Sequence, residues 1–328
     1  MQATLSLITG AAGFIGSHLT DRLLAEGHRV IGIDNLLLGR RSSLSGAFQR
    51  SDFSFIETDV NDYDGCLRAV QAQAGRRPVD MVWHLAANSD IRAGTADPDV
   101  DLRHTFLSTF HTLKLMRTIG ARRLAFASSS AIYGPHDGLL TEEAGPLQPI
   151  SNYGAMKLAS EGIISAALET SLERAWIFRF PNVVGPRSTH GVLFDFLKKL
   201  KASPLELEVL GDGRQEKPYL HVSELIDAMV LIWQQACERL NCYNIGPVGA
   251  GTTVRRIAEW VVRQAAPQAR IRYTGGPRGW AGDVPKFSYS IEKLRRLGWM
   301  PRLASGEAVQ RAIAELAQEH GMGDPVQS

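Results

Sequence analysis

Short apolar runs alternate with amphipathic stretches along the first 180 residues, and this alternation restricts the possible folds more than any other feature. Helical spacing is visible in the stripe Ile15, Leu19, Leu23, Leu24. The remaining elements are expected as strands over 5–9, 30–33, 53–56, 81–87, 124–127 and 175–178, and as helices over 62–73, 99–118 and 152–170. Nearly continuous apolar strands between helices indicate a parallel sheet covered on both faces. We therefore predict an α/β fold with a Rossmann-type doubly wound sheet.

Beyond residue 180 the regular alternation weakens, and glycine and proline interrupt the chain at 185–191, 203–218 and 246–252. Such a change is expected where the chain leaves the main sheet and forms a smaller lobe from loops and short elements. We predict a dinucleotide-binding domain over 1–180, to which 219–246 returns. A smaller C-terminal substrate-binding lobe is predicted over 181–218 and 247–328.

Composition excludes several classes of protein. Hydrophobic residues make up 44% of the 328 residues and charged residues 21%, which is ordinary for a globular chain. A net charge of +2 argues against a broad nucleic-acid surface. Three cysteines, none in a Cys-x-x-Cys pair, argue against a disulfide framework or a zinc site. Since there is no leader-like start and no apolar run near the ~18 residues that span a bilayer, we expect a cytoplasmic protein without a membrane contact.

A glycine-rich loop joins the first predicted strand to the first helix. It has the spacing Gly-x-x-Gly-x-x-Gly at Gly10, Gly13 and Gly16. Small residues allow a tight turn and a close approach of the backbone to a pyrophosphate, which then lies at the helix N-terminus. Because this loop stands between a strand and a helix, it predicts a dinucleotide site.

A carboxylate at the end of the second strand bears on which dinucleotide binds. Asp34 lies 24 residues after Gly10, where an acid binds the adenosine ribose hydroxyls and repels the 2′-phosphate of NADP. Arg40 and Arg41 could instead receive that phosphate, but Asp34 favours NAD. Asp59, after the third strand, could meet the adenine amino group or could be the N-cap of helix 62–73.

Tyr153 and Lys157 lie four residues apart in a predicted helix and therefore share one face. An ammonium beside a phenol favours the phenolate, so we expect Lys157 to lower the pKa of Tyr153 from its reference of about 10. The phenol would then accept a proton near neutral pH. The pair predicts a catalytic base.

Several motifs in this order resemble the extended short-chain dehydrogenase/reductase family, and more narrowly its NAD-dependent nucleotide-sugar epimerases and dehydratases. In the first half they are the glycine loop Thr9–Gly16, the segment Asp34-Asn35-Leu to Gly39, Leu85-Ala86-Ala87, Ser128–Gly134 and Tyr153-x-x-x-Lys157. In the second half Arg179–Arg187 and Gly211–Val222 are similar to the family's sugar-nucleotide segments.

The resemblance implies roles for particular residues. Ser129 would hydrogen-bond the sugar hydroxyl that reacts, Tyr153 would be the base, and Lys157 would bind the nicotinamide ribose and tune Tyr153. The implied cofactor-binding residues are Gly10, Ala12, Gly13, Phe14, Ile15, Gly16, Asp34, Asn35, Gly39, Asp59, Val60, Leu85, Ala86, Ala87, Thr105, Tyr153, Lys157 and Pro181. The implied substrate-binding residues are Ser129, Asn182, His190, Val192, Lys217 and Arg278.

This sequence departs from the family's pattern at a few of these positions. Lys217 stands where an arginine commonly faces the diphosphate, and a lysine supplies the charge without the bidentate fork, so Arg214 could assist. Arg278 is displaced by two positions from the family's phosphate-binding arginine, and Trp280 occupies the usual place. Thr105 replaces an asparagine that touches the cofactor, and its hydroxyl can also donate. His190 could reach the sugar or the base, or be a solvated loop residue.

The resemblance also implies a shared opening step, in which Tyr153 takes the proton of the C4 hydroxyl while C4 gives hydride to NAD. In the family's 4,6-dehydratases the positions that correspond to 129–131 resemble Thr-Asp-Glu. In its decarboxylases the position that corresponds to 131 is a glutamate. This chain has Ser129, Ser130 and Ala131. Since these side chains cannot do carboxylate chemistry, we predict that the hydride returns to C4.

The expected enzyme is therefore an isomerase, a 4-epimerase of a UDP-hexose or UDP-hexuronate. A 4,6-dehydratase, a decarboxylase, an NADPH-dependent reductase and a non-catalytic dinucleotide-binding sensor remain as alternatives. The resemblance further implies a homodimer through the helices near 99–118 and 152–170, which would bury Phe106, Phe110 and Leu113 between chains.

Overall fold

A computed structural model of the chain describes residues 4–135, 138–276 and 288–322. The chain divides into two compact units. The first unit comprises Met1–Gly134, Gly145–Phe180 and Ile226–Tyr243, and the second comprises Pro135–Ala144, Pro181–Leu225 and Asn244–Ser328. The returning segment, Ile226–Tyr243, is thus shorter than the predicted 219–246, and Pro135–Ala144 leaves the first unit for the second.

The first unit is built on a seven-stranded sheet of order β12-β7-β5-β4-β1-β2-β3. Its strands are β1 (Leu5–Thr9), β2 (Arg29–Asp34), β3 (Phe53–Glu57), β4 (Met81–His84), β5 (Arg123–Ala127), β7 (Arg174–Arg179) and β12 (Leu240–Asn244). The pairs β1–β2, β2–β3, β1–β4, β4–β5 and β5–β7 are all parallel. The predicted doubly wound parallel sheet is confirmed. Its strand order reverses between β1 and β4, and ligands bind at such a switch point.

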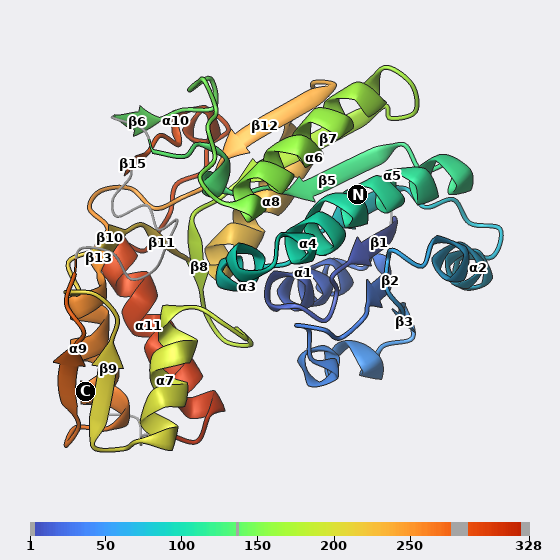
Figure 1. Cartoon of the computed structure of the whole chain (residues 1–328). Coiled ribbons are helices and arrows are strands. Elements are labelled where there is room, and N and C mark those ends of the chain that lie inside the picture. The colour runs from blue at the N-terminus through green and yellow to red at the C-terminus, as the bar shows by residue number, and fades with distance from the viewer. Residues whose placement is uncertain (1–3, 136–137, 277–287, 323–328) are drawn as a thin grey trace. The chain divides into compact units, whose positions relative to one another are not determined.

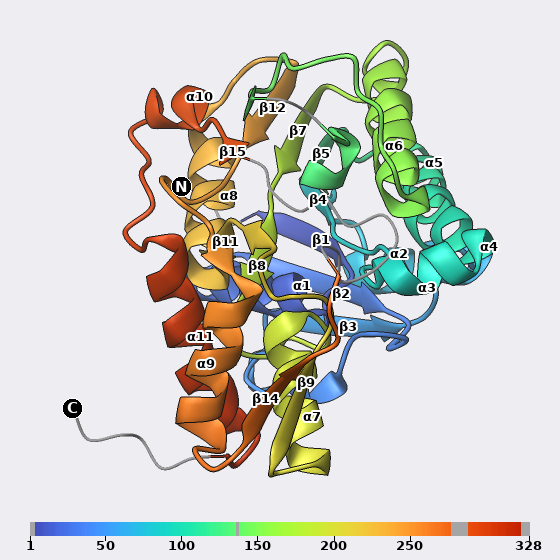
Figure 2. The same ribbon diagram turned by 60° about the vertical axis from the view of Figure 1, so that its left-hand side comes forward.

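Helices cover both faces of this sheet, as Figure 2 shows for α5 and α6 on one side and α8 on the other. The helices of the unit are α1 (Phe14–Ala25), α2 (Tyr63–Ala74), α3 (Ile91–Ala96), α4 (Pro98–Asp101), α5 (Ser108–Ile119), α6 (Asn152–Leu168) and α8 (Val222–Gln235), with 3₁₀ turns η1 (Arg41–Leu44), η2 (Ala47–Gln49) and η4 (Ser130–Ile132). An ion pair between Arg22 and Asp227 joins α1 to α8. On the opposite face, apolar side chains of α2, α5 and α6 pack with those of the strands, including Leu7, Val82 and Leu115.

The stretch predicted as one helix over 99–118 contains a wider turn. Between α4 and α5 the segment η3 (Leu102–Leu107) is a π-helix. Three small polar side chains on this stretch, Thr105, Thr109 and Thr112, are buried although they are polar. Such π turns occur as single-turn insertions inside α-helices and are frequent at functional sites.

The second unit has its own hydrophobic core, and the sheets among its described residues are all two-stranded. Its elements are β6 (Leu139–Leu140), β8 (Asn182–Val184), α7 (Val192–Ala202), β9 (Glu206–Val209), β10 (Glu216–Lys217), β11 (Tyr219–His221), β13 (Thr252–Thr253), α9 (Val254–Ala265), β14 (Arg270–Tyr273), β15 (Ser288–Tyr289), α10 (Glu292–Arg295) and α11 (Ser305–Glu319). Helices α7, α9 and α11 pack together with β9 around Leu197, Val261 and Ile313, and Figure 1 shows these helices side by side. Within the described residues, no helix is long and apolar enough to cross a membrane.

Candidate active site

The glycine loop lies at the switch point between β1 and β4. A Cβ on Gly10 would lie 2.7 Å from the backbone nitrogen of Ala86, and a Cβ on Gly16 would lie 2.0 Å from the carbonyl oxygen of Gly10. A side chain at either position would therefore collide with the backbone, so both positions require glycine. Helix α1 begins at Phe14 after Gly13, which offers no side-chain cap, and its first turn carries no acidic residue. Its first N–H groups therefore have no acceptor inside the helix, and the site fits a pyrophosphate.

Asp34 closes the loop from the end of β2. Its carboxylate accepts hydrogen bonds from the backbone nitrogens of Ala12 at 2.9 Å and Leu36 at 2.8 Å. Gly39 crosses directly over this carboxylate, since a Cβ there would lie 2.8 Å from its Oδ1. Burial raises the pKa of Asp34, and the hydrogen bonds from the backbone oppose that rise. The acid thus lies beside the phosphate loop, as predicted, and its contact with a ribose remains a prediction.

Two other predicted cofactor residues make contacts inside the protein. Asp59 accepts from the backbone nitrogen of Asn61 at 2.8 Å and from the amide of Asn35 at 2.9 Å. The alternative that Asp59 caps the next helix is wrong, because Asp62 is the N-cap of α2. Thr105 is buried, and its hydroxyl accepts from the backbone nitrogen of Asn88 at 3.2 Å. Their contacts with NAD stay predictions, as do those of Val60, Leu85 and Ala87.

Gly16→Ala is expected to weaken NAD binding at least about tenfold, a loss of ~1.4 kcal/mol. The added methyl would collide with the backbone of Gly10, so the loop must open or α1 must shift. Isothermal titration with NAD measures the loss. Gly46→Ala is the matched control, because a Cβ there meets nothing within 4 Å. Equal NAD affinity in the Gly16 variant and the wild type would contradict this account of the loop.

The catalytic candidates meet at the N-terminus of α6. Ser151 caps this helix, with its side chain accepting from the backbone nitrogen of Gly154 at 3.1 Å. A Cβ on Gly154 would lie 2.4 Å from the carbonyl oxygen of Ala131, so glycine lets the first turn of α6 approach η4. This approach brings Tyr153 to Ser129, whose side chain hydrogen-bonds the phenol.

Lys157 is buried one turn along α6. Its Nζ donates to the carbonyl oxygen of Ala127 at 2.6 Å and lies 4.7 Å from the ring centroid of Phe126 and 5.8 Å from that of Tyr153. Burial lowers the pKa of Lys157 to about 7, while the carboxylates of Glu161 and Asp101 raise it. The structure therefore places the predicted pair on one helix face.

The expected lowering of the pKa of Tyr153 is wrong for the chain by itself. Burial raises the pKa of Tyr153 to about 12, and the negative charge of Asp101 adds to the rise. The hydrogen bond from Ser129 acts in the opposite direction. The nearby ammonium is visible in the sequence, whereas desolvation, which penalises the phenolate, arises only when the chain packs.

A buried ion pair between Arg179 and Glu161 lies one helical turn beyond Lys157 on α6. The Nη2 of Arg179, at the end of β7, lies 2.7 Å from Oε2 of Glu161 on α6, and its Nη1 donates to the hydroxyl of Tyr133 at 3.1 Å. The hydroxyl of Ser128 also donates to Glu161. Both partners of the pair are less than a tenth exposed. The charge of Glu161 is therefore compensated inside the unit.

His84, the last residue of β4, is a buried histidine. The hydroxyl of Thr109 donates to the carbonyl oxygen of Thr105 at 3.0 Å, so its 3.0 Å contact with Nε2 of His84 fits a tautomer with the proton on Nε2. The hydroxyl of Thr9 then donates to Nδ1 of His84 at 2.7 Å. Burial and the neighbouring Lys157 lower the pKa of His84 to about 3. His84 therefore carries no charge at neutral pH.

Residues 6–246 match the model of the NAD dependent epimerase/dehydratase family. The chain belongs to this family. Membership confirms the predicted resemblance and the predicted cofactor, NAD, which the glycine loop and Asp34 would hold.

Three relatives named as epimerases match over nearly their whole length. The UDP-glucose 4-epimerase of Mycolicibacterium smegmatis is 30% identical over 315 residues, 94% of this chain and 97% of its own. A crystal structure of UDP-galactose 4-epimerase is 34% identical, with a TM-score of 0.82 over 96% of this chain and 99% of that one. The UDP-glucose 4-epimerase of Thermus thermophilus in complex with NAD is 30% identical, with a TM-score of 0.81 over 95% and 98%.

The family also contains relatives with another reaction. UDP-glucuronic acid decarboxylase 1 of Arabidopsis thaliana is 27% identical over 332 residues, which are 97% of this chain and 72% of that protein. Family membership therefore indicates an enzyme that acts on nucleotide sugars with NAD, and the reaction must be argued from the site.

The predicted substrate residues Asn182, His190, Val192 and Lys217, together with Pro181, belong to the second unit. Asn182 begins β8 and is exposed, and Lys217 lies on β10 opposite Thr252. Val192 is the first residue of α7, and Nδ1 of His190 lies 3.3 Å from the hydroxyl of Thr189. Arg278 lies outside the described residues. The binding roles of all six remain predictions.

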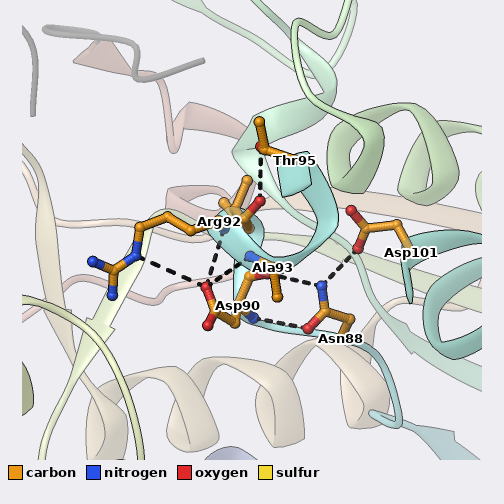
Figure 3. Close-up of polar contacts among 7 residues, drawn as sticks. Asn88, Asp90, Arg92, Ala93, Thr95 and Asp101 are labelled. Carbon is orange, nitrogen blue, oxygen red and sulfur yellow. Dashed lines mark hydrogen bonds and ion pairs between the residues drawn. The ribbon is translucent and has the colours of Figure 1, made fainter. Parts of the chain in front are cut away.

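One residue beside the site was not predicted. Asp101, at the end of α4, is fully buried, and its Oδ1 accepts from the side-chain amide of Asn88 at 2.8 Å. Figure 3 shows this contact and the neighbouring N-terminus of α3, where Asp90 caps the helix. In the sequence Asp101 differs from Asp97 and Asp99 only by its spacing of four residues from Thr105.

Proposed function

We propose that this member of the family is an NAD-dependent nucleotide-sugar 4-epimerase that inverts C4 of a UDP-hexose or a UDP-hexuronate. The observation that carries the proposal is the assembly of Ser129, Tyr153 and Lys157 at one end of the sheet. Ser129 lies in the turn that follows β5, and Tyr153 lies in the first turn of α6, next to its N-cap. Lys157 is buried one helical turn further along α6.

The residues of the chain would move one proton in each direction. Tyr153, as phenolate, would take the proton of the C4 hydroxyl and later return it to the new C4 oxygen. Ser129 would hydrogen-bond the same oxygen and orient it toward Tyr153. Bound NAD supplies the hydride acceptor for C4 and the donor that returns the hydride to the opposite face of the resulting 4-keto sugar. The reaction then balances without a further reactant.

The turn η4 favours inversion over the other reactions of the family. Elimination of water or loss of carbon dioxide after the first step calls for acid–base groups near Ser129. The next two residues are Ser130 and Ala131, both half-buried in η4. Neither a hydroxyl nor a methyl group does the work of a carboxylate at neutral pH. Return of the hydride is the fate that this turn supports.

The choice of UDP rests on the relatives rather than on a contact in this chain. The similar epimerases are named for UDP-glucose and UDP-galactose, and the relative with a different reaction is named for UDP-glucuronic acid. These three relatives are all named for a UDP-sugar. We therefore propose that UDP is the nucleotide and that the hexose or hexuronate is the part to be determined.

Proton NMR in D2O tests the reaction and the substrate together. The protein is incubated with NAD and, separately, with UDP-glucose, UDP-galactose, UDP-glucuronate and dTDP-glucose. A new anomeric signal of the C4 epimer, without deuterium in the sugar, is expected for one UDP-sugar. Deuterium at C3 or C5, a persistent keto sugar or a UDP-pentose would overturn the proposal in favour of enolisation, dehydration or decarboxylation. Oxidation of NADPH by a keto sugar would instead indicate a reductase.

We further propose that the enzyme is a homodimer. Phe110 on α5 is 49% exposed and Leu102 on η3 is 40% exposed, and both lie on the helical stretch that the family resemblance implies for the interface. A second copy packed on this stretch would cover them. Sedimentation velocity should give twice the monomer mass of 35.9 kDa, and a monomer would refute the dimer without affecting the catalytic proposal.

A further inference from the structure

A half-satisfied carboxylate lies next to the catalytic helix. Oδ1 of Asp101 accepts from the amide of Asn88 at 2.8 Å and from the hydroxyl of Thr105 at 3.5 Å. Its Oδ2 is buried and has no hydrogen-bond partner among the residues that the structure describes. Figure 3 shows one carboxylate oxygen directed at Asn88 and the other away from it. A buried, incompletely paired carboxylate is costly unless a nearby cation compensates it.

The backbone is shaped around this carboxylate. A Cβ on Gly94 would lie 1.7 Å from Oδ2 of Asp101, so any other residue at position 94 would displace it. The carbonyl oxygen of Gly94 in turn accepts from the amide of Asn152, at the start of α6, at 2.9 Å. Helices α3 and α4 therefore both pack on the helix that carries Tyr153 and Lys157.

The charged groups around Lys157 can be sorted by whether they are already compensated. Glu161, on the same helix, is paired with Arg179 from β7. His84, from β4, is neutral because its pKa lies near 3. The contacts of Lys157 with β5 are made by the carbonyl oxygen of Ala127 and the ring of Phe126, neither of which carries a charge. Asp101 remains as the acid near Lys157 without an ion-pair partner of its own among the described residues.

We propose that Asp101 is the counter-ion of the catalytic pair, a positioning residue whose buried carboxylate keeps the ammonium of Lys157 protonated. Asp101 acts through Lys157 and does not touch the reacting atoms. Burial favours the neutral amine, and the negative charge of Glu161, followed by that of Asp101, stabilises the ammonium against it. The same negative charge disfavours the phenolate of Tyr153, so Asp101 also restrains the base.

The other charges that face Asp101 are consistent with this role. From α6 they are Lys157, which lowers the pKa of Asp101, and Tyr153; from the N-terminus of α3 it is Asp90, which raises it. Burial has the largest effect and raises the pKa of Asp101. Removing the Lys157 cation would therefore favour protonation of Asp101, as expected of two groups that hold each other charged.

The test follows the ionisation of Lys157 directly. The full chain loaded with NAD is labelled with ¹³C at the ε-carbon of its eight lysines, and the Lys157 signal is assigned by its loss in Lys157→Arg. Its titration midpoint is compared between wild type, Asp101→Asn and Asp97→Asn. Asp97 is the matched control, because it caps α4 from the surface and asparagine caps a helix as well as aspartate.

Asp101→Asn should lower the Lys157 midpoint by about one pH unit, since it removes a nearby opposite charge, and Asp97→Asn should leave it unchanged. An unchanged midpoint in Asp101→Asn, or an equal shift in Asp97→Asn, would overturn the proposal. If the asparagine variant does not fold, Asp101→Ser, which removes the charge and places a smaller group against Gly94, is measured instead.

The effect on turnover rests on the proposed function, whereas the NMR titration does not. If the chain is an epimerase, the high-pH limb of kcat in Asp101→Asn should move down with the Lys157 midpoint. A simple loss of packing would lower kcat without moving that limb. A lysine midpoint that shifts without any epimerase activity in the wild type would leave the counter-ion role intact and refute only the proposed reaction.

Discussion

Tyr153→Phe should lose most of its epimerase turnover, by about 10²- to 10⁴-fold, because removal of a positioned acid–base group costs roughly that much. The ring stays in place, and Lys157, the glycine loop and Asp34 are unchanged, so NAD affinity should remain within about twofold. The measurement is kcat by coupled assay with the substrate found by NMR, together with NAD binding by titration calorimetry.

Tyr63→Phe is the matched control for this experiment. The hydroxyl of Tyr63 hydrogen-bonds Thr118 at 2.7 Å on the surface of the unit, away from α6. Loss of that hydroxyl should leave turnover unchanged. Wild-type turnover in Tyr153→Phe would refute the assignment of Tyr153 as the base, and equal losses in both variants would point to a general effect on folding.

Glu161→Gln should reduce the free energy of unfolding by about 3–5 kcal/mol, the usual cost of leaving one partner of a buried ion pair uncompensated. The carboxylate of Glu161 accepts from Nε of Arg179 at 3.1 Å and from its Nη2 at 2.7 Å. An amide can accept only one of these bonds and directs its own N–H groups at the donors of Arg179. The buried guanidinium then keeps its charge but loses the carboxylate with which it is paired.

Urea unfolding followed by circular dichroism measures the effect, in the presence and absence of NAD. The control is Glu173→Gln, which removes a surface ion pair with Arg123 in which each side chain is 48% exposed. That change should cost at most about 0.5 kcal/mol. Similar losses in the two variants would show that the buried pair between Glu161 and Arg179 contributes no more to the free energy of unfolding than a surface ion pair.

The strands and helices of the first unit were predictable because their apolar side chains repeat with a clear period. Strand β1 and helices α2 and α6 lie within about two residues of their predicted positions. The seventh strand, β12, was not predicted, because its run Leu240-Asn-Cys-Tyr-Asn244 carries two asparagines. Pairing with the neighbouring strand β7, rather than local preference, selects the extended conformation of this run. At its start the backbone nitrogen of Ala175 on β7 donates to the carbonyl oxygen of Arg239 at 2.8 Å.

The grouping of Ser129, Tyr153 and Lys157 was predictable from motifs, whereas their ionisation was not. Spacing along a helix indicated that Tyr153 and Lys157 share a face, and the resemblance to the family indicated Ser129. The pKa of Tyr153 depends on how much water each group loses and on a carboxylate from another element. Such quantities arise only when α4, α6 and β5 pack together, and no spacing along the chain encodes them.

Asp101 shows the same limit in a single residue. It lies in the run Asp97-Pro-Asp99-Val-Asp101, which reads as a solvated helix start, and two of its three acids are indeed exposed. Only its separation of four and eight residues from Thr105 and Thr109 hints that it faces inward. That signal is weak, because polar residues at helical spacing usually face solvent.

The π turn at Leu102–Leu107 has a consequence for how this helix tolerates change. A π turn amounts to one extra residue in an α-helix, and each residue of an α-helix advances by about 100° around the axis. Asp101 and Thr109 are eight residues apart, so in a regular α-helix their side chains would point about 80° apart. The wider turn absorbs the extra residue and lets both face the interior. Deleting one residue within the turn would leave them seven residues apart in a regular helix, about 20° from two full turns, so both would still face inward. A further inserted residue, in contrast, would rotate the two ends of the helix against each other by about 100°.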